Sequence, residues 1–91
     1  MKLLDLRRGS LAFEHKGEIF VLYGELSGGT FIAWRDWSDR LTPEGERVEL
    51  TEKEKDKVID IVKKYWNNKS CIIDFVDNNL HVIYTTEKIK G

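Results

Sequence analysis

The chain has 91 residues, of which 41% are hydrophobic and 34% charged, with a formal net charge of -1. This length predicts one domain, residues 1–91, with a single small core. The composition is not that of a disordered protein, and the near-neutral charge argues against nucleic-acid binding. The lone cysteine excludes an internal disulfide. Because the first residues resemble neither a signal sequence nor an anchor, we expect a cytoplasmic protein with no membrane partner.

Three strands are predicted in the first part of the chain. Residues 10–15 alternate in hydrophobicity, as a half-buried strand does. Residues 18–26 are apolar on both faces, which is typical of a central strand, and Gly24 within them predicts a bulge or close packing. Residues 30–34 form the third strand of the meander. Trp34 shares a face with Ile32 in this strand, which predicts that Trp34 lies in the core.

Residues 35–50 are predicted to form a long loop. They show neither a helical period nor clean alternation, and sixteen residues exceed the usual connection of about 4–6. Long loops of this kind are usually functional or disordered. With Trp37 and an excess of carboxylates, this one is interpreted as a contact surface.

A helix is predicted to begin after Thr51. Thr51-Glu52-Lys53-Glu54 matches the capping box, in which the first and last residues exchange hydrogen bonds. An apolar stripe with helical spacing follows it: Val58, Ile59, Ile61, Val62, Tyr65 and Trp66. Trp66 is expected in the core, and Asn67-Asn68 is expected to end the helix in a left-handed conformation.

A second hairpin is predicted after the helix. Residues 71–76 and 80–85 are apolar runs, joined by Asp77-Asn78-Asn79, whose asparagines suit positive φ. The predicted fold class is therefore α+β. It is an antiparallel sheet of about five strands, made from the three-stranded meander and the C-terminal hairpin, packed on one helix.

The sequence contains no recognisable catalytic or metal motif, so we expect a non-enzyme without cofactor or metal. His15 and His81 lack partners at zinc-ligand spacing, and Cys71 starts an apolar strand, which favours a core position. The carboxylate pairs of the loop leave an enzymatic interpretation open, because two spaced carboxylates can act as acid and base.

The distribution of charge is more informative than any motif. Residues 36–56 hold eight acidic and four basic residues, a formal charge of -4, which leaves +3 for the rest of the chain. Such a segment can steer and orient a basic partner. Trp37 lies within it, and tryptophan is enriched among the residues that dominate interfaces. The residues predicted to bind a partner are Asp36, Trp37, Asp39, Arg40, Glu44, Glu46 and Glu49.

Several of these features together resemble one family. They are Arg8-Gly9-Ser10-Leu11, the strand ending Gly24-Glu25-Leu26, the Gly28-Gly29 turn before Phe31, the tryptophan-containing acidic loop, and Thr51-Glu52-Lys53-Glu54-Lys55 before Val58-Ile59. The pattern, over about residues 8–64, is similar to the immunity protein 74 family of bacterial polymorphic toxin systems. The resemblance implies a cytosolic antidote, with no catalytic residues, that binds a cognate toxin domain. The acidic loop with its tryptophan would suit a basic partner such as a nuclease.

Two further interpretations stay open beside the immunity protein. One is a small non-catalytic adaptor or structural domain, a monomer or weak homodimer that pairs through an exposed sheet edge. The other is an enzyme that uses loop carboxylates, for which a deep pocket would be required.

Overall fold

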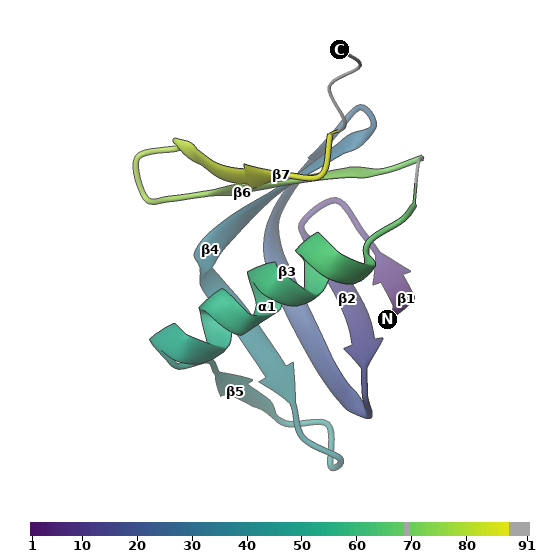
Figure 1. Ribbon diagram of the computed structural model, residues 1–91. Coiled ribbons are helices and arrows are strands. Elements are labelled where there is room, and N and C mark those ends of the chain that lie inside the picture. The colour runs from purple at the N-terminus through teal and green to yellow at the C-terminus, as the bar shows by residue number, and fades with distance from the viewer. Residues whose placement is uncertain (69, 88–91) are drawn as a thin grey trace.

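The part of the chain that the structure describes has an α+β fold, with one helix and a mixed sheet (Figure 1). A computed structural model describes residues 1–68 and 70–87. Along the chain the elements are β1 (Lys2–Leu6), β2 (Ser10–His15), β3 (Glu18–Ser27), β4 (Thr30–Leu41), β5 (Arg47–Glu49), α1 (Glu52–Tyr65), β6 (Ile72–Val76) and β7 (Val82–Thr85). The sheet order is β1-β2-β3-β4-β6-β7, and β5 pairs with the far half of β4. The class was predicted correctly, but the prediction of about five strands was too low.

The sequence predicted an antiparallel sheet, but the sheet is mixed. β6 runs parallel to β4, from Thr30 opposite Ile72 to Trp34 opposite Val76. The cause is the connection: α1 carries the chain back across the sheet, so β6 enters in the direction of β4. The predicted C-terminal hairpin does form, with β6 and β7 antiparallel.

The first strand, β1, was missed by the sequence analysis. It pairs antiparallel with β2, with Leu3 opposite Phe13 and Leu6 opposite Leu11. Leu3 and Leu6 both pack against the core. A register shift between Leu3 and Asp5 puts Leu3 and Leu6 on the same face although they are three residues apart. The strand therefore shows no simple alternation.

The predicted loop over residues 35–50 is wrong. β4 continues to Leu41, and β5 returns beside it with Leu41 opposite Arg47. A tight turn joins the two strands, with Gly45 at φ 84° donating its N–H to the Thr42 carbonyl over 2.8 Å. Most side chains in this half of β4 are polar and half-buried, and a bulge breaks its alternation with the first half.

The bulge expected at Gly24 is confirmed. Leu22 pairs with Ser38 but Gly24 pairs with Ala33, so residues 34–37 of β4 stand opposite Tyr23 alone. A side chain at Gly24 would meet the backbone of β4 at Ile32 and Ala33, which explains why glycine is required.

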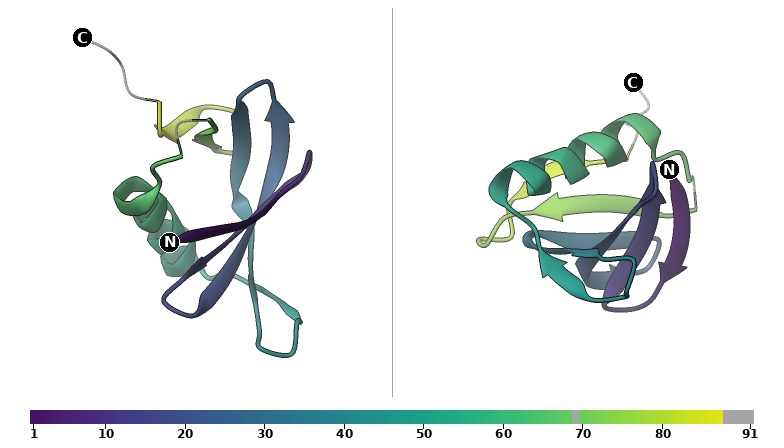
Figure 2. Two further views of the ribbon diagram at one scale, coloured as in Figure 1. Left: turned by 90° about the vertical axis from the view of Figure 1, so that its right-hand side faces the viewer. Right: turned by 90° about the horizontal axis from the view of Figure 1, so that it is seen from below.

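The core lies between one face of the sheet and α1, and no helix of the described residues covers the other face (Figure 2). The largest fully buried side chains are Phe13, Phe20, Phe31, Phe75, Leu11, Leu22, Ile73, Val58 and Val62. The predicted capping box of Thr51 and Glu54 is present and starts α1 as expected. Trp66 packs against the core, as predicted, and donates its indole N–H to the Cys71 carbonyl over 2.9 Å.

Three local predictions were wrong. Trp34 is not a core residue: Phe31 and Ala33 face α1, so Trp34 lies half-buried on the opposite face. Asn67 and Asn68 do not take positive φ, because α1 ends with an extended Trp66. In the β6–β7 turn, too, positive φ falls on Leu80 and not on the asparagines.

Candidate functional site

The bulge in β4 puts two tryptophans on the face of the sheet away from α1. Trp34 and Trp37 are in edge-to-face contact, with ring centroids 5.3 Å apart. Trp37 is 60% exposed, which is unusual for so large an apolar side chain. Because residues 34–37 are extra to the register, the chain can turn Trp37 outward without breaking the core.

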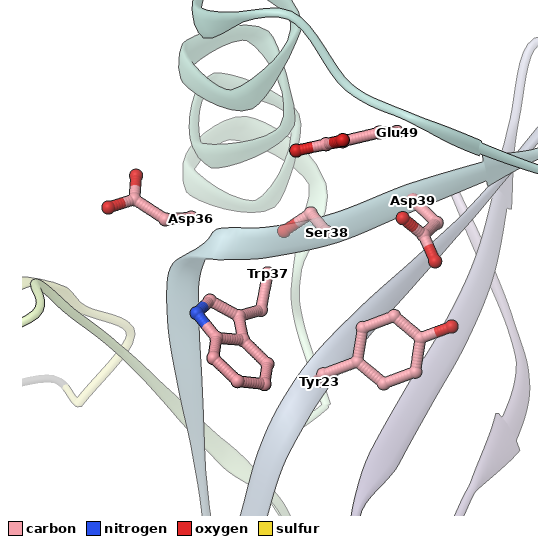
Figure 3. Close-up of a pocket in the computed structure, with 6 residues that line it drawn as sticks. All are labelled: Tyr23, Asp36, Trp37, Ser38, Asp39 and Glu49. Atoms are coloured by element: carbon pink, nitrogen blue, oxygen red, sulfur yellow. The ribbon is translucent and has the colours of Figure 1, made fainter.

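Trp37 forms one wall of an open pocket of about 330 Å³. The lining residues are Tyr23, Asp36, Trp37, Ser38, Asp39 and Glu49 (Figure 3). The rings of Trp37 and Tyr23 lie side by side on the side of β4 away from the helix (Figure 3). Four of the seven residues predicted to bind a partner therefore meet in one place: Asp36, Trp37, Asp39 and Glu49.

The other three predicted residues lie elsewhere. Arg40 pairs with the buried Phe20 of β3 and turns toward α1, where its Nε lies 3.7 Å from the Glu54 carboxylate. Glu44 and Glu46 are exposed in the β4–β5 turn, beyond the pocket.

Arg35 ties the bulge to the start of α1. Its guanidinium lies 2.8 Å from each of the carboxylates of Asp36, Glu52 and Asp56, and only 18% of its side chain is exposed. The hydrogen bonds that it donates to these carboxylates, Asp56 first, raise the pKa of Arg35 above its already high value. The acidic surface expected over the loop and helix start is thus partly neutralised at its centre.

Tyr23 and Arg47 are site residues that the sequence analysis missed. The Arg47 guanidinium stands 5.5 Å from the centre of the Tyr23 ring and donates a hydrogen bond to the Tyr23 hydroxyl. Burial raises the pKa of Tyr23, and hydrogen bonding to Asp39 raises it further. The hydroxyl therefore stays protonated and joins Arg47 to Asp39 across the pocket. Only the pairing of β3 with β4 brings Tyr23 there.

The remaining reactive side chains lie outside this pocket. Cys71 is buried in the core, as predicted, and burial raises the pKa of its thiol. His15 packs on Tyr65 with ring centroids 4.7 Å apart, and burial lowers its pKa. His81 is exposed, 3.7 Å from Asp77. Across residues 1–68 and 70–87, no three histidine, cysteine, aspartate or glutamate side chains gather closely enough to hold a metal ion.

Comparisons of the chain with models of protein families, with curated proteins and with solved structures found no match. In the part of the chain that the structure describes, the single helix is too short and too polar to cross a bilayer. The pocket beside Trp37 therefore has to be interpreted from its own chemistry.

Proposed function

We propose that the chain is an immunity protein that binds a cognate bacterial toxin domain in the cytoplasm and neutralises it by direct contact, without catalysing a reaction. The exposed Trp37 beside Asp39 and Glu49 is the observation that carries this proposal. An indole left in water beside a concave surface is typical of an interface anchor. The resemblance to the immunity protein 74 family points the same way.

The charges beside the anchor favour a basic partner. Asp39 and Glu49 flank Trp37, and neither forms an ion pair with any residue that the structure describes. Charges of this kind speed association with a basic surface and fix its orientation. A basic nuclease fits, because carboxylates held against its phosphate-binding side chains would block access of the substrate.

The proposal is tested by expressing the chain with the toxin domain encoded beside it and measuring binding by calorimetry. Trp37→Ala is expected to weaken binding by about 2 kcal/mol or more, roughly 30-fold in Kd. Asp60→Asn, which removes an exposed charge of α1 outside the pocket, is the matched control and should cost less than about 0.5 kcal/mol.

Two results would count against the proposal in different ways. If the Trp37→Ala, Asp39→Ala double variant loses no more than about 0.5 kcal/mol, the pocket is not the centre of the interface. If the unaltered chain neither binds the toxin domain nor protects cells from it, the immunity function itself is refuted.

The exposed strand β7 favours a second candidate, a homodimeric adaptor. Leu80, Val82 and Ile83 are 67%, 56% and 49% exposed, and β7 ends the sheet order of the described strands. Such an edge can pair with the same strand of a second copy. Molecular mass that rises with concentration, and falls back in Ile83→Lys, would support this candidate; a monomer at every concentration would exclude it.

A further inference from the structure

We propose that the pocket receives an arginine side chain of the partner, stacked on Trp37 and paired with Asp39 and Glu49. This inference rests on the proposed binding function and names the group that the pocket recognises. The chemistry of the lining carries it: two aromatic rings and three carboxylates surround one open space. Aromatic faces and carboxylates both attract cations.

One lining residue, Tyr23, already binds a guanidinium of the chain itself. Arg47 lies over the Tyr23 ring and bonds to its hydroxyl. The Tyr23 ring and hydroxyl are therefore already engaged by Arg47, and Asp36 is paired with Arg35. Asp39 and Glu49, which form no ion pair with the described residues, remain beside the indole of Trp37, and no cation of those residues lies over that indole.

A guanidinium suits this remaining space better than an ammonium. It is planar, so it can lie flat on the indole while its edge donates to carboxylates. An ammonium of lysine is a strongly hydrated point charge and gains less from either contact.

The openness of the pocket favours a side chain on a protein over a free small molecule. Sites for small ligands usually enclose most of the ligand surface, whereas this one leaves Trp37 largely in solvent. A partner surface would close the pocket from above and exclude the remaining water, which strengthens a charged contact.

The experiment needs no toxin. A blocked peptide with one arginine is titrated into the protein, and the indole N–H signal of Trp37 is followed by NMR. The same peptide with lysine, and with citrulline, which keeps the shape of arginine but carries no charge, are the probe controls. We expect a saturable shift of the indole signal at millimolar arginine peptide. The lysine peptide should bind at least about threefold more weakly than the arginine peptide, and the citrulline peptide should not bind.

Matched variants locate the site. Asp39→Asn and Glu49→Gln should each weaken arginine binding by about two- to fivefold, and Asp60→Asn, an exposed change on α1, should leave it unchanged. An unchanged thermal unfolding midpoint in all three excludes misfolding as the cause. Equal binding of citrulline and arginine, or a shift that survives both pocket substitutions, would overturn the inference.

The outcomes separate the inference from the function on which it rests. If Trp37→Ala weakens toxin binding but no arginine probe binds, the partner uses another anchor and the inference fails alone. If the arginine peptide binds in the pocket but the toxin domain does not bind the protein, the inference about the pocket is supported and the proposed immunity function is refuted.

Discussion

Gly24→Ala would test how the fold builds its bulge. Gly24 pairs with Ala33, and a Cβ on Gly24 would lie 2.8 Å from the Ile32 carbonyl carbon and 3.0 Å from the Ala33 Cα. These distances are at or below the closest approach that side-chain carbons show in proteins. The obstacle is backbone, which has no rotamer by which to move aside, so β3 and β4 would have to separate.

The expected cost follows from the hydrogen bonds that flank the bulge. Each intramolecular bond contributes about 0.5–1.5 kcal/mol net, and each buried group left unpaired costs about 1–3 kcal/mol. Loss of two bonds with one group unpaired amounts to about 2–6 kcal/mol. A chain of this length has a total stability of roughly 5–14 kcal/mol, so the variant would lose a large share of it.

Urea unfolding followed by tryptophan fluorescence measures this loss. Gly9→Ala is the matched control, because its Cβ would lie 3.9 Å from the Gly24 carbonyl oxygen, an ordinary contact. We expect the control to change the free energy of unfolding by less than about 1 kcal/mol. A Gly24→Ala variant within about 1 kcal/mol of the unaltered chain would refute the reasoning, as would equal damage from both substitutions.

Other predictions concern the helix start and the core. Thr51→Ala removes the cap of α1 and should cost about 1 kcal/mol in urea unfolding, whereas Lys53→Ala, an exposed change in the same turn, leaves the cap in place. Hydrogen bonding to the Thr51 backbone holds the pKa of Glu54 below its ordinary value. The ionised Glu54 carboxylate therefore stabilises the fold fully above the ordinary pKa, and this stabilisation is lost as the pH falls through the lowered pKa. The stability difference between the unaltered chain and Glu54→Gln should therefore shrink on acidification; a constant difference would contradict this. Phe75→Ala empties a fully buried site and should cost about 3–5 kcal/mol, against less than about 1 kcal/mol for Val48→Ala on the exposed β5, both by urea unfolding.

The parts of the fold that follow from local sequence were predicted well. The start of α1 depends on residues within one turn, since Thr51 and Glu54 satisfy each other. The strand β2 follows from alternation, and the first part of β3 follows from an apolar run on both faces; the sequence displays both patterns. The bulge at Gly24 was also expected, because a glycine weakens a strand interior and usually marks a bulge or a close approach of backbone.

The errors share a physical cause, which is contact between distant segments. Alternation correctly placed Trp34 with Ile32, but which face is buried depends on where α1 packs. The parallel pairing of β4 with β6 likewise depends on the path of α1. β4 was cut short at Trp34 because the four-residue bulge, which exists only relative to β3, interrupts its period.

The candidate site was predicted in part for the same reason. Asp36, Trp37 and Asp39 are close in sequence, and their gathering was expected. Tyr23 comes from β3 and Arg47 from β5, and only the register of β4 with both strands joins them to the pocket. One feature of the sequence could have pointed to Tyr23: it is the aromatic residue directly before Gly24, where the bulge was expected.

Arg35 connects the site to the fold, and Arg35→Gln tests that connection. With its contacts to Glu52 and Asp56 lost, the bulge is no longer held to α1, and Trp37 should leave its edge-to-face contact with Trp34. Two indoles this close give coupled transitions, so the far-ultraviolet circular dichroism should show an exciton couplet that Arg35→Gln reduces. We also expect a stability loss of about 1 kcal/mol that fades in high salt, because the carboxylates of Glu52 and Asp56 are exposed and salt screens their attraction to Arg35. Trp37→Phe, which removes the couplet without touching Arg35, is the control. If Arg35→Gln keeps both the full couplet and the full stability, the bulge holds its shape through Gly24 alone.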